Sequence, residues 1–135
     1  MSLITQPIPS DSPGGKRRVL VVEDEAIIAR DIAMQLRDLG FDVLGPVASG
    51  EKAIVLAGEL RPDLVLMDIH LAGALDGIAT AVAIREQFNV PTVYLSAFDT
   101  ADSLARARLA MPLGYLSKPF TDRALRELMA LALPV

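Results

Sequence analysis

Short continuous apolar runs alternate along the chain with segments in which apolar residues recur at helical spacing. The runs are rich in β-branched residues, and a run such as Leu64 to Met67 suits a strand that is buried on both faces. The predicted strands lie at 17–23, 41–46, 63–68, 91–96 and 113–117. This order predicts a parallel sheet with helices on both faces.

The segments between these runs carry the periodicity of amphipathic helices. The recurring apolar positions are Ile28, Ile32, Leu36 and Leu39, then Ile78, Val82 and Phe88, then Leu125, Leu128, Met129 and Ala132. Ser49, Thr100 and Thr121 stand where a side-chain oxygen can cap the helix that follows, and Gly40 stands where a helix should stop. We therefore interpret the apolar stripes as core faces.

Right-handed crossovers between five β/α units favour an α/β, flavodoxin-like (βα)5 three-layer sandwich, with a parallel five-stranded sheet in the order 2-1-3-4-5. The 135 residues, 52% of them hydrophobic, are enough for a single domain with a substantial core. Proline, glycine and serine dominate residues 1–15, which predicts a flexible N-terminal tail before a domain at 16–135.

Composition narrows the class of protein. Thirteen basic and 17 acidic residues give a net charge of −4 without a basic cluster, so direct nucleic-acid binding is not expected. The chain has no cysteine, which leaves out disulfides and thiolate metal sites. Every apolar run is far shorter than the ~20 residues of a membrane span, and no secretory signal is visible. We expect a cytoplasmic protein without a membrane partner.

Charged residues follow three of the predicted strands. Glu23 and Asp24 end the first run, Asp68 ends the third, and Lys118 follows the fifth. Because the carboxyl ends of parallel strands border one crevice, these groups should meet there. Three ionised carboxylates repel one another and call for a cation, and oxygen ligands suit Mg²⁺ or Mn²⁺.

Magnesium beside an aspartate and a lysine indicates phosphoryl chemistry. An aspartate can attack phosphorus to give an aspartyl phosphate, while a metal and a lysine neutralise the transferring oxygens. Asp68 is the predicted nucleophile and Lys118 the predicted clamp. Ser96, at the end of the fourth run, is placed to contact a phosphoryl oxygen and to sense its arrival.

Five short motifs follow one another along the chain. They are Val-Val-Glu-Asp-Glu at 21–25, Pro-Asp-Leu-Val-Leu-Met-Asp at 62–68, Asp-Gly at 76–77, Ser-Ala at 96–97 and Gly-Tyr-Leu-Ser-Lys-Pro-Phe at 114–120. With these motifs the chain, from about Arg17 to about Leu133, resembles the receiver domain of response regulators in bacterial two-component systems.

The resemblance implies roles for single residues. Glu23, Asp24, Asp68 and the backbone carbonyl of His70 would bind Mg²⁺. Asp68 would take a phosphoryl group from a histidine kinase or a histidine phosphotransfer protein, and Lys118 would contact that group together with Ser96.

The resemblance also implies a switch. Tyr115 would rotate inward when Ser96 moves toward the phosphoryl group, and Pro119 would carry a cis peptide bond that aims the preceding lysine. The side chains of His70 and Phe98 would tune the lifetime of the phosphorylated state. We expect a switch that catalyses only its own phosphorylation and dephosphorylation, acts on an output partner, and can form a homodimer through the fourth helix, fifth strand and fifth helix.

Three positions depart from the family pattern. Ala72 stands where many receivers have proline, Asp76 follows Asp68 by eight positions, one more than is common, and Glu23 replaces an aspartate. The loop after Asp68 is therefore expected to differ in shape. Whether the chain is a stand-alone regulator or part of a longer one stays open.

Other classes of function are left as alternatives. A Mg²⁺-dependent aspartyl-phosphate phosphatase or phosphotransferase typically has a second acid two residues after the nucleophile, where this chain has His70. A phosphorylation-independent pseudo-receiver binding module would use the same fold, but the retained acids, hydroxyl and lysine argue against it. A flavin carrier is disfavoured because acids stand where a phosphate cradle needs glycines and hydroxyls.

Overall fold

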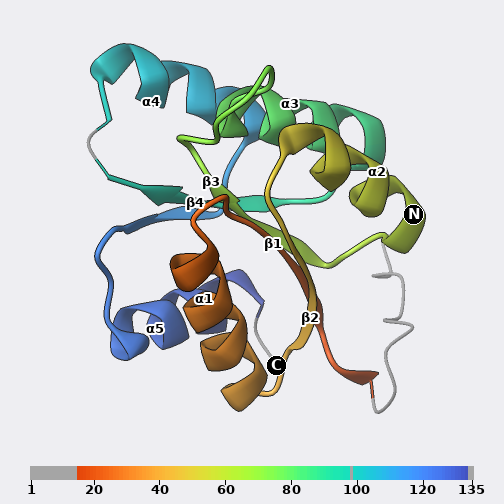
Figure 1. Ribbon diagram of the computed structural model, residues 1–135, viewed down its shortest axis with the longest axis vertical. Helices are drawn as coiled ribbons and strands as arrows, with labels where there is room; N and C mark the ends of the chain where they lie inside the picture. The colour runs from red at the N-terminus through yellow and green to blue at the C-terminus, as the bar shows by residue number, and fades with distance from the viewer. Residues whose placement is uncertain (1–14, 98, 134–135) are drawn as a thin grey trace, which may run out of the picture.

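The computed structural model describes residues 15–97 and 99–133, and over these ranges five parallel strands form one sheet in the order β2-β1-β3-β4-β5 (Figure 1). The strands are β1 (Arg18–Val22), β2 (Asp42–Val47), β3 (Leu64–Asp68), β4 (Thr92–Ser96) and β5 (Gly114–Ser117). The helices are α1 (Ala26–Asp38), α2 (Gly50–Leu60), α3 (Gly77–Phe88), α4 (Ala101–Ala107), its 3₁₀ extension η2 (Arg108–Ala110), and α5 (Asp122–Ala132). The predicted fold class and strand order are confirmed.

Helices cover both faces of the sheet. Figure 1 shows α1 and α5 on one face and α2, α3 and α4 on the other. Val19 and Val21 of β1 pack toward α1 and α5, whereas Leu20 and Val22 pack toward α2 and α3. Because side chains alternate between the faces of a strand, a sheet covered on both faces needs apolar residues at consecutive positions. This explains the uninterrupted apolar run of the sequence.

The ends of the helices follow the sequence signals. Ser49, Thr100 and Thr121 accept hydrogen bonds from the backbone N–H three residues later, as predicted. Gly40 follows the end of α1 with a φ of +96°, a conformation that favours glycine. One cap was not anticipated, because Asp76 was noted only as part of a motif: its Oδ1 accepts from the N–H of Ala79 at 2.8 Å and begins α3.

The predicted strand limits agree with the structure to within about a residue, with one irregularity in β2. The Gly45–Pro46 peptide bond is cis, and the pairing of β1 with β2 shifts register between Leu20 and Val22. The predicted tail over 1–15 lies, apart from Gly15, outside the described residues. No helix among residues 15–97 and 99–133 combines the length and apolar character that a membrane span requires.

Candidate functional site

The carboxyl ends of β1 and β3 lie side by side and bring three carboxylates together. The strands pair in register, with Val22 opposite Met67, so the residues that follow them share one edge of the sheet. Carboxylate oxygens of Glu23, Asp24 and Asp68 all lie within 4.8 Å of one another. Glu23 and Asp68 are buried, whereas Asp24 is partly exposed. The predicted acidic cluster is therefore present.

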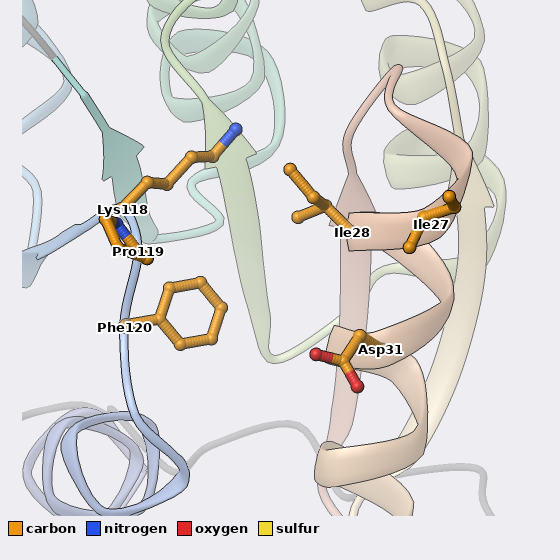
Figure 2. Close-up of a pocket in the computed structure, with 6 residues that line it drawn as sticks. All are labelled: Ile27, Ile28, Asp31, Lys118, Pro119 and Phe120. Atoms are coloured by element: carbon orange, nitrogen blue, oxygen red, sulfur yellow. The ribbon is translucent and has the colours of Figure 1, made fainter.

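Lys118 directly follows the carboxyl end of β5, and its side chain reaches this cluster. Its Nζ lies 2.5 Å from Oε1 of Glu23 and 3.4 Å from Oδ2 of Asp68, and its side chain is only 15% exposed. Figure 2 shows the ammonium group extending toward the end of β3, away from Pro119 and Phe120. The Lys118–Pro119 peptide bond is cis. Lys118 is thus a partly buried partner of two carboxylates and not a solvated surface lysine.

Burial controls the electrostatics of the site. It raises the pKa of Glu23 to about 7, because the hydrogen bond from Lys118 only partly offsets the desolvation and Asp68 adds to the rise. Burial lowers the pKa of Lys118, but the hydrogen bond to Glu23 and the charge of Asp68 outweigh it, so the net pKa is raised. The ammonium group of Lys118 contacts two of the three carboxylates, and a divalent cation with a preference for oxygen ligands would complete the charge balance. The donor set fits Mg²⁺.

Backbone amides hold each carboxylate in place. The N–H of His70 donates to Oδ1 of Asp68 at 2.9 Å, and the N–H of Ala72 donates to Oδ2 of Asp24 at 2.9 Å. The N–H of Glu25 donates to Oε2 of Glu23 at 3.1 Å. Asp24 therefore does not cap α1, whose N-cap is Glu25 without a side-chain cap bond. A proline at 72 would lack the N–H, so the departure from the family pattern contributes a contact to the site.

Gly77 allows α3 to approach the site closely. A Cβ atom on Gly77 would lie 1.8 Å from the backbone oxygen of Asp68. The N–H of Gly77 donates to the carbonyl oxygen of Ile69 at 3.1 Å, which ties the start of α3 to the chain just after Asp68. The Asp76-Gly77 motif thus has two local roles, because Asp76 caps the helix and Gly77 removes a steric clash.

Ser96 lies one strand away from Asp68. The residue before it, Leu95, pairs with Asp68, and Ser96 is 7% exposed at the end of β4. A hollow of about 410 Å³ lies beside Ser96, between β5 and α4. Its lining is Ser96, Ala97, Asp99, Leu104, Arg108, Tyr115 and Ser117. Tyr115 is 40% exposed, and its ring stacks on that of buried Tyr94 at a centroid distance of 5.6 Å.

The His70 side chain has a partner that sequence reasoning missed. Its Nε2 lies 2.9 Å from Oδ1 of Asp99, which follows β4. In the sequence, Asp99 is notable only for its position directly before Thr100, the N-cap of α4. That position does not predict a contact with His70, which lies 29 residues earlier in the chain. Phe98, predicted to act with His70, lies outside the described residues.

Comparison with known proteins places this geometry in a family. The family described as "Response regulator receiver domain" matches residues 19–130. The chain belongs to this family. Receiver domains are the phosphoacceptor switches of two-component systems, and the predicted family is therefore confirmed. The match includes β1 except for its first residue, every strand and helix from α1 to β5, and most of α5.

Curated relatives of this receiver domain include two regulators. The transcriptional regulatory protein PdtaR of Mycobacterium tuberculosis is 40% identical over 118 residues, covering 87% of this chain and 57% of PdtaR. The DNA-binding response regulator MtrA of Mycobacterium leprae is 38% identical over 114 residues, covering 82% of this chain and 48% of MtrA. The chain thus spans about half the length of the curated relatives it matches.

Solved structures also resemble this receiver domain. The signal receiver domain of a modulated diguanylate cyclase from Desulfovibrio desulfuricans has a TM-score of 0.82 and 38% identity, over 87% of this chain and 94% of that one. The receiver domain of the sensor histidine kinase PA1611 from Pseudomonas aeruginosa, solved with magnesium in its active-site cleft, has a TM-score of 0.75 and 34% identity, over 87% and 98% of the two chains.

Proposed function

We propose that this receiver domain accepts a phosphoryl group on Asp68 from a histidine kinase or a histidine phosphotransfer protein and passes the signal to an output partner. The observation that carries the proposal is the meeting of three carboxylates with Lys118 at the ends of β1, β3 and β5. Burying several charges together costs stability, and such clusters are common at functional sites. This receiver domain therefore has the groups that phosphoryl transfer needs, a nucleophilic carboxylate, further carboxylates for a metal ion and an ammonium group.

The transfer has a simple balance of bonds. A carboxylate oxygen of Asp68 attacks phosphorus and forms the P–O bond of an aspartyl phosphate, while the P–N bond to the donor imidazole breaks. The imidazole nitrogen leaves with the electron pair of that bond, and the nitrogen can then accept a proton. Hydrolysis returns the carboxylate and releases phosphate. Asp68 is prepared for this step because the N–H of His70 fixes its Oδ1.

Mg²⁺ or Mn²⁺ would be held by Glu23, Asp24, Asp68 and the backbone carbonyl of His70. The ion, when bound, supplies positive charge for the transferring phosphoryl oxygens. PA1611 provides support, since its receiver domain contains magnesium in the active-site cleft. The close approach of the three carboxylates in this chain provides further support.

Lys118 and Ser96 would contact the phosphoryl group. Lys118 lies 3.4 Å from Oδ2 of Asp68, close enough for its ammonium group to stabilise an oxygen transferred to that carboxylate. The hydroxyl of Ser96 belongs to the neighbouring strand and would donate to a second oxygen. The N–H of Lys118 donates to the carbonyl oxygen of Ser96 at 2.7 Å, so a movement of either residue would affect the other.

Tyr115 would be the moving part of the switch. It lies beside the hollow next to Ser96, which gives its ring a space to enter when Ser96 moves toward the phosphoryl group. The pre-existing balance between outward and inward positions would shift on phosphorylation. Leu109, Met111 and Leu113, all exposed, lie along the segment that leads into β5 and offer an apolar surface to an output partner or to a second copy in a homodimer.

The phosphoryl donor would approach beside α1. A groove of about 290 Å³ separates α1 from the segment after β5, and in Figure 2 Ile28, Asp31 and Phe120 point into it. Ile27, which also lines the groove, is 85% exposed. A donor helix with apolar residues would cover this groove while its histidine reached Asp68.

His70 and Phe98 would tune the lifetime of the aspartyl phosphate by controlling the path of water. The side chain of His70 is half exposed, so it is accessible at the edge of the site. The test is the rate of dephosphorylation in variants at both positions. An unchanged rate in both variants would contradict this role.

The alternatives have weaker support. A phosphatase or phosphotransferase acting on a separate substrate would need a second acid near the nucleophile, and His70 instead pairs with Asp99. A pseudo-receiver would not need the full set of Glu23, Asp24, Asp68 and Lys118. We therefore favour a switch that turns over only its own phosphoryl group, located in the cytoplasm, with residues 16–135 as its domain and residues 1–15 as a tail.

The experiment is intact-mass analysis of the full chain after incubation with acetyl phosphate and Mg²⁺. Asp68→Asn and a chelator serve as controls. One added phosphoryl group that is lost in both controls is the expected result. The absence of an adduct, also when hydrolysis is slowed at low temperature, would favour the pseudo-receiver.

A further inference from the structure

His70 connects the phosphoacceptor to the neighbouring loop. Its backbone N–H donates to Oδ1 of Asp68 at 2.9 Å, and its ring Nε2 lies 2.9 Å from Oδ1 of Asp99. Asp68 ends β3, and Asp99 follows β4, the adjacent strand. A single residue thus makes one hydrogen bond to the reacting carboxylate and one to a carboxylate of the next loop.

The Asp99 end of this connection is the buried end. The side chain of Asp99 is 7% exposed, whereas that of His70 is 50% exposed. A buried carboxylate needs a hydrogen-bonding or charged partner, and within the described part of the chain its ion pair is with His70. The carboxylate therefore fixes the position of the ring, because the side chain of Asp99 is far less exposed than that of His70 and has less freedom to move.

We propose that Asp99 is a positioning residue for phosphorylation of Asp68. It anchors the His70 ring, and the anchored residue in turn holds the peptide N–H that orients the Asp68 carboxylate. This inference rests on the proposed role of Asp68 as phosphoacceptor. It adds a group that neither binds the metal nor touches the phosphoryl group.

The position of the hydrogen bonds explains why the effect should reach the reaction. With Oδ1 held by the N–H of His70, Oδ2 is the oxygen that lies near Lys118. If the ring of His70 loses its anchor, the loop after β3 gains freedom and the carboxylate can rotate away from the lysine. Small errors of position can cost a large factor in rate, and we expect roughly a 3- to 10-fold slower phosphorylation.

The test measures the rate of phosphorylation by acetyl phosphate at saturating Mg²⁺, and intact-mass analysis monitors the phosphorylated fraction over time. The variants are Asp99→Leu, which removes the acceptor at similar volume, His70→Ala, and the double variant. We expect each single variant to be roughly 3- to 10-fold slower and the double variant to be no slower than the slower single one, because both changes break one connection.

Conservative variants separate positioning from general damage to the fold. Asp99→Asn keeps an oxygen acceptor, and His70→Gln keeps a side-chain N–H donor, so each should recover most of the rate lost in Asp99→Leu or His70→Ala. Arg106→Leu is the matched control, because it removes a residue of α4 whose exposed ion pair is with Asp76, the N-cap of α3, and it should leave the rate unchanged. If Asp99→Leu does not fold, the His70 pair of variants carries the test.

The outcomes are distinct. Rates in Asp99→Leu and His70→Ala that equal the rate of the unaltered chain would overturn the proposal while leaving Asp68 as the acceptor. Multiplicative losses in the double variant, or a His70→Gln variant as slow as His70→Ala, would overturn it as well. A chain that takes up no phosphoryl group before any substitution would instead overturn the proposed function.

Discussion

The two sides of the sheet edge differ in how tightly they are held. At the ends of β1 and β3, Glu23 and Asp68 are buried, paired with Lys118 and fixed by backbone amides. On the β4 and β5 side, Ser96 at the end of β4 and Tyr115 within β5 border a hollow of about 410 Å³. A tightly held region suits chemistry that needs fixed positions, and a loosely filled region suits a change of conformation.

The segment that leads into β5 also carries exposed apolar side chains. Leu109, Met111 and Leu113 are each about half exposed or more, and they follow one another along the segment from η2 to β5. Exposed apolar side chains close together in the sequence are a common mark of a contact surface. Under the proposed function, Asp68 at the end of β3 would react, with Lys118 reaching it from the end of β5, and Tyr115 of β5 would carry the readout.

Lys118→Met should have the largest effect, because it removes the cation that faces two buried carboxylates. We expect the rate of phosphorylation to fall roughly 100-fold or more, the scale seen when one preorganised charge-stabilising group is lost. The rate is measured by intact mass with acetyl phosphate and Mg²⁺. Lys52→Met, which removes an exposed lysine from α2, is the control, and an equal loss in both variants would contradict the assignment.

Gly77→Ala should damage both stability and chemistry. Its Cβ would meet the backbone oxygen of Asp68, and overpacking against a backbone atom should cost about 3 kcal/mol of unfolding free energy. The phosphorylation rate should fall roughly tenfold in addition. Both quantities are measured on the purified variant, by urea unfolding and by intact mass.

Gly50→Ala is the matched control for Gly77→Ala. Its Cβ would meet Oγ1 of Thr80 at 2.1 Å, so this variant is also destabilised, but the nearest atoms belong to Thr80 and Leu75 and not to Asp68. We expect a lower stability with a nearly unchanged phosphorylation rate under conditions where the chain is folded. A rate loss as large as that of Gly77→Ala would mean that stability alone explains both variants.

Ala72→Pro should weaken metal binding. Proline has no N–H, so Oδ2 of Asp24 loses its 2.9 Å hydrogen bond and the carboxylate is less well oriented. Hydrogen bonds to charged groups contribute about 1.5–3 kcal/mol, and we expect a drop of roughly 10- to 100-fold in Mg²⁺ affinity. Isothermal titration measures it. Ala72→Gly retains the N–H, and an equal loss in that variant would show that the amide is unimportant.

Tyr115→Ala should have the smallest effect on stability and rate. The side chain is partly exposed, so we expect a loss below about 1 kcal/mol and a phosphorylation rate within roughly twofold. The conformational response of α4 to phosphorylation should nevertheless be lost. A full response in Tyr115→Ala would contradict the switch role.

Tyr94→Phe tests the buried neighbour of Tyr115, whose hydroxyl donates to the carbonyl oxygen of Ala107 at 3.1 Å.

The sequence allowed the fold to be predicted because each strand and helix carries its own signal. The apolar runs gave strand limits that differ from those observed by about a residue, and Ser49, Thr100 and Thr121 cap helices as predicted. The meeting of Glu23, Asp24, Asp68 and Lys118 followed from the topology, since the carboxyl ends of parallel strands converge.

Contacts made by loops were not predictable in the same way. The bonds from Ala72 to Asp24 and from His70 to Asp99 join residues 48 and 29 positions apart, and they depend on the path of loops that have no periodic pattern. The hollow beside Tyr115 was likewise invisible, because an empty volume depends on how several elements pack at once. The roles of these residues in phosphoryl transfer stay predictions.

Hydrogen–deuterium exchange with and without phosphorylation tests the central claim most directly. The full chain is compared with Mg²⁺ alone and with Mg²⁺ plus acetyl phosphate, and intact mass confirms that Asp68 is occupied. We predict that peptides covering α4, η2 and β5 change their exchange, while peptides covering β1 and β3 change little. Full phosphorylation without a change in α4, η2 and β5, or with a change confined to β1 and β3, would contradict the division between a held site and a moving surface.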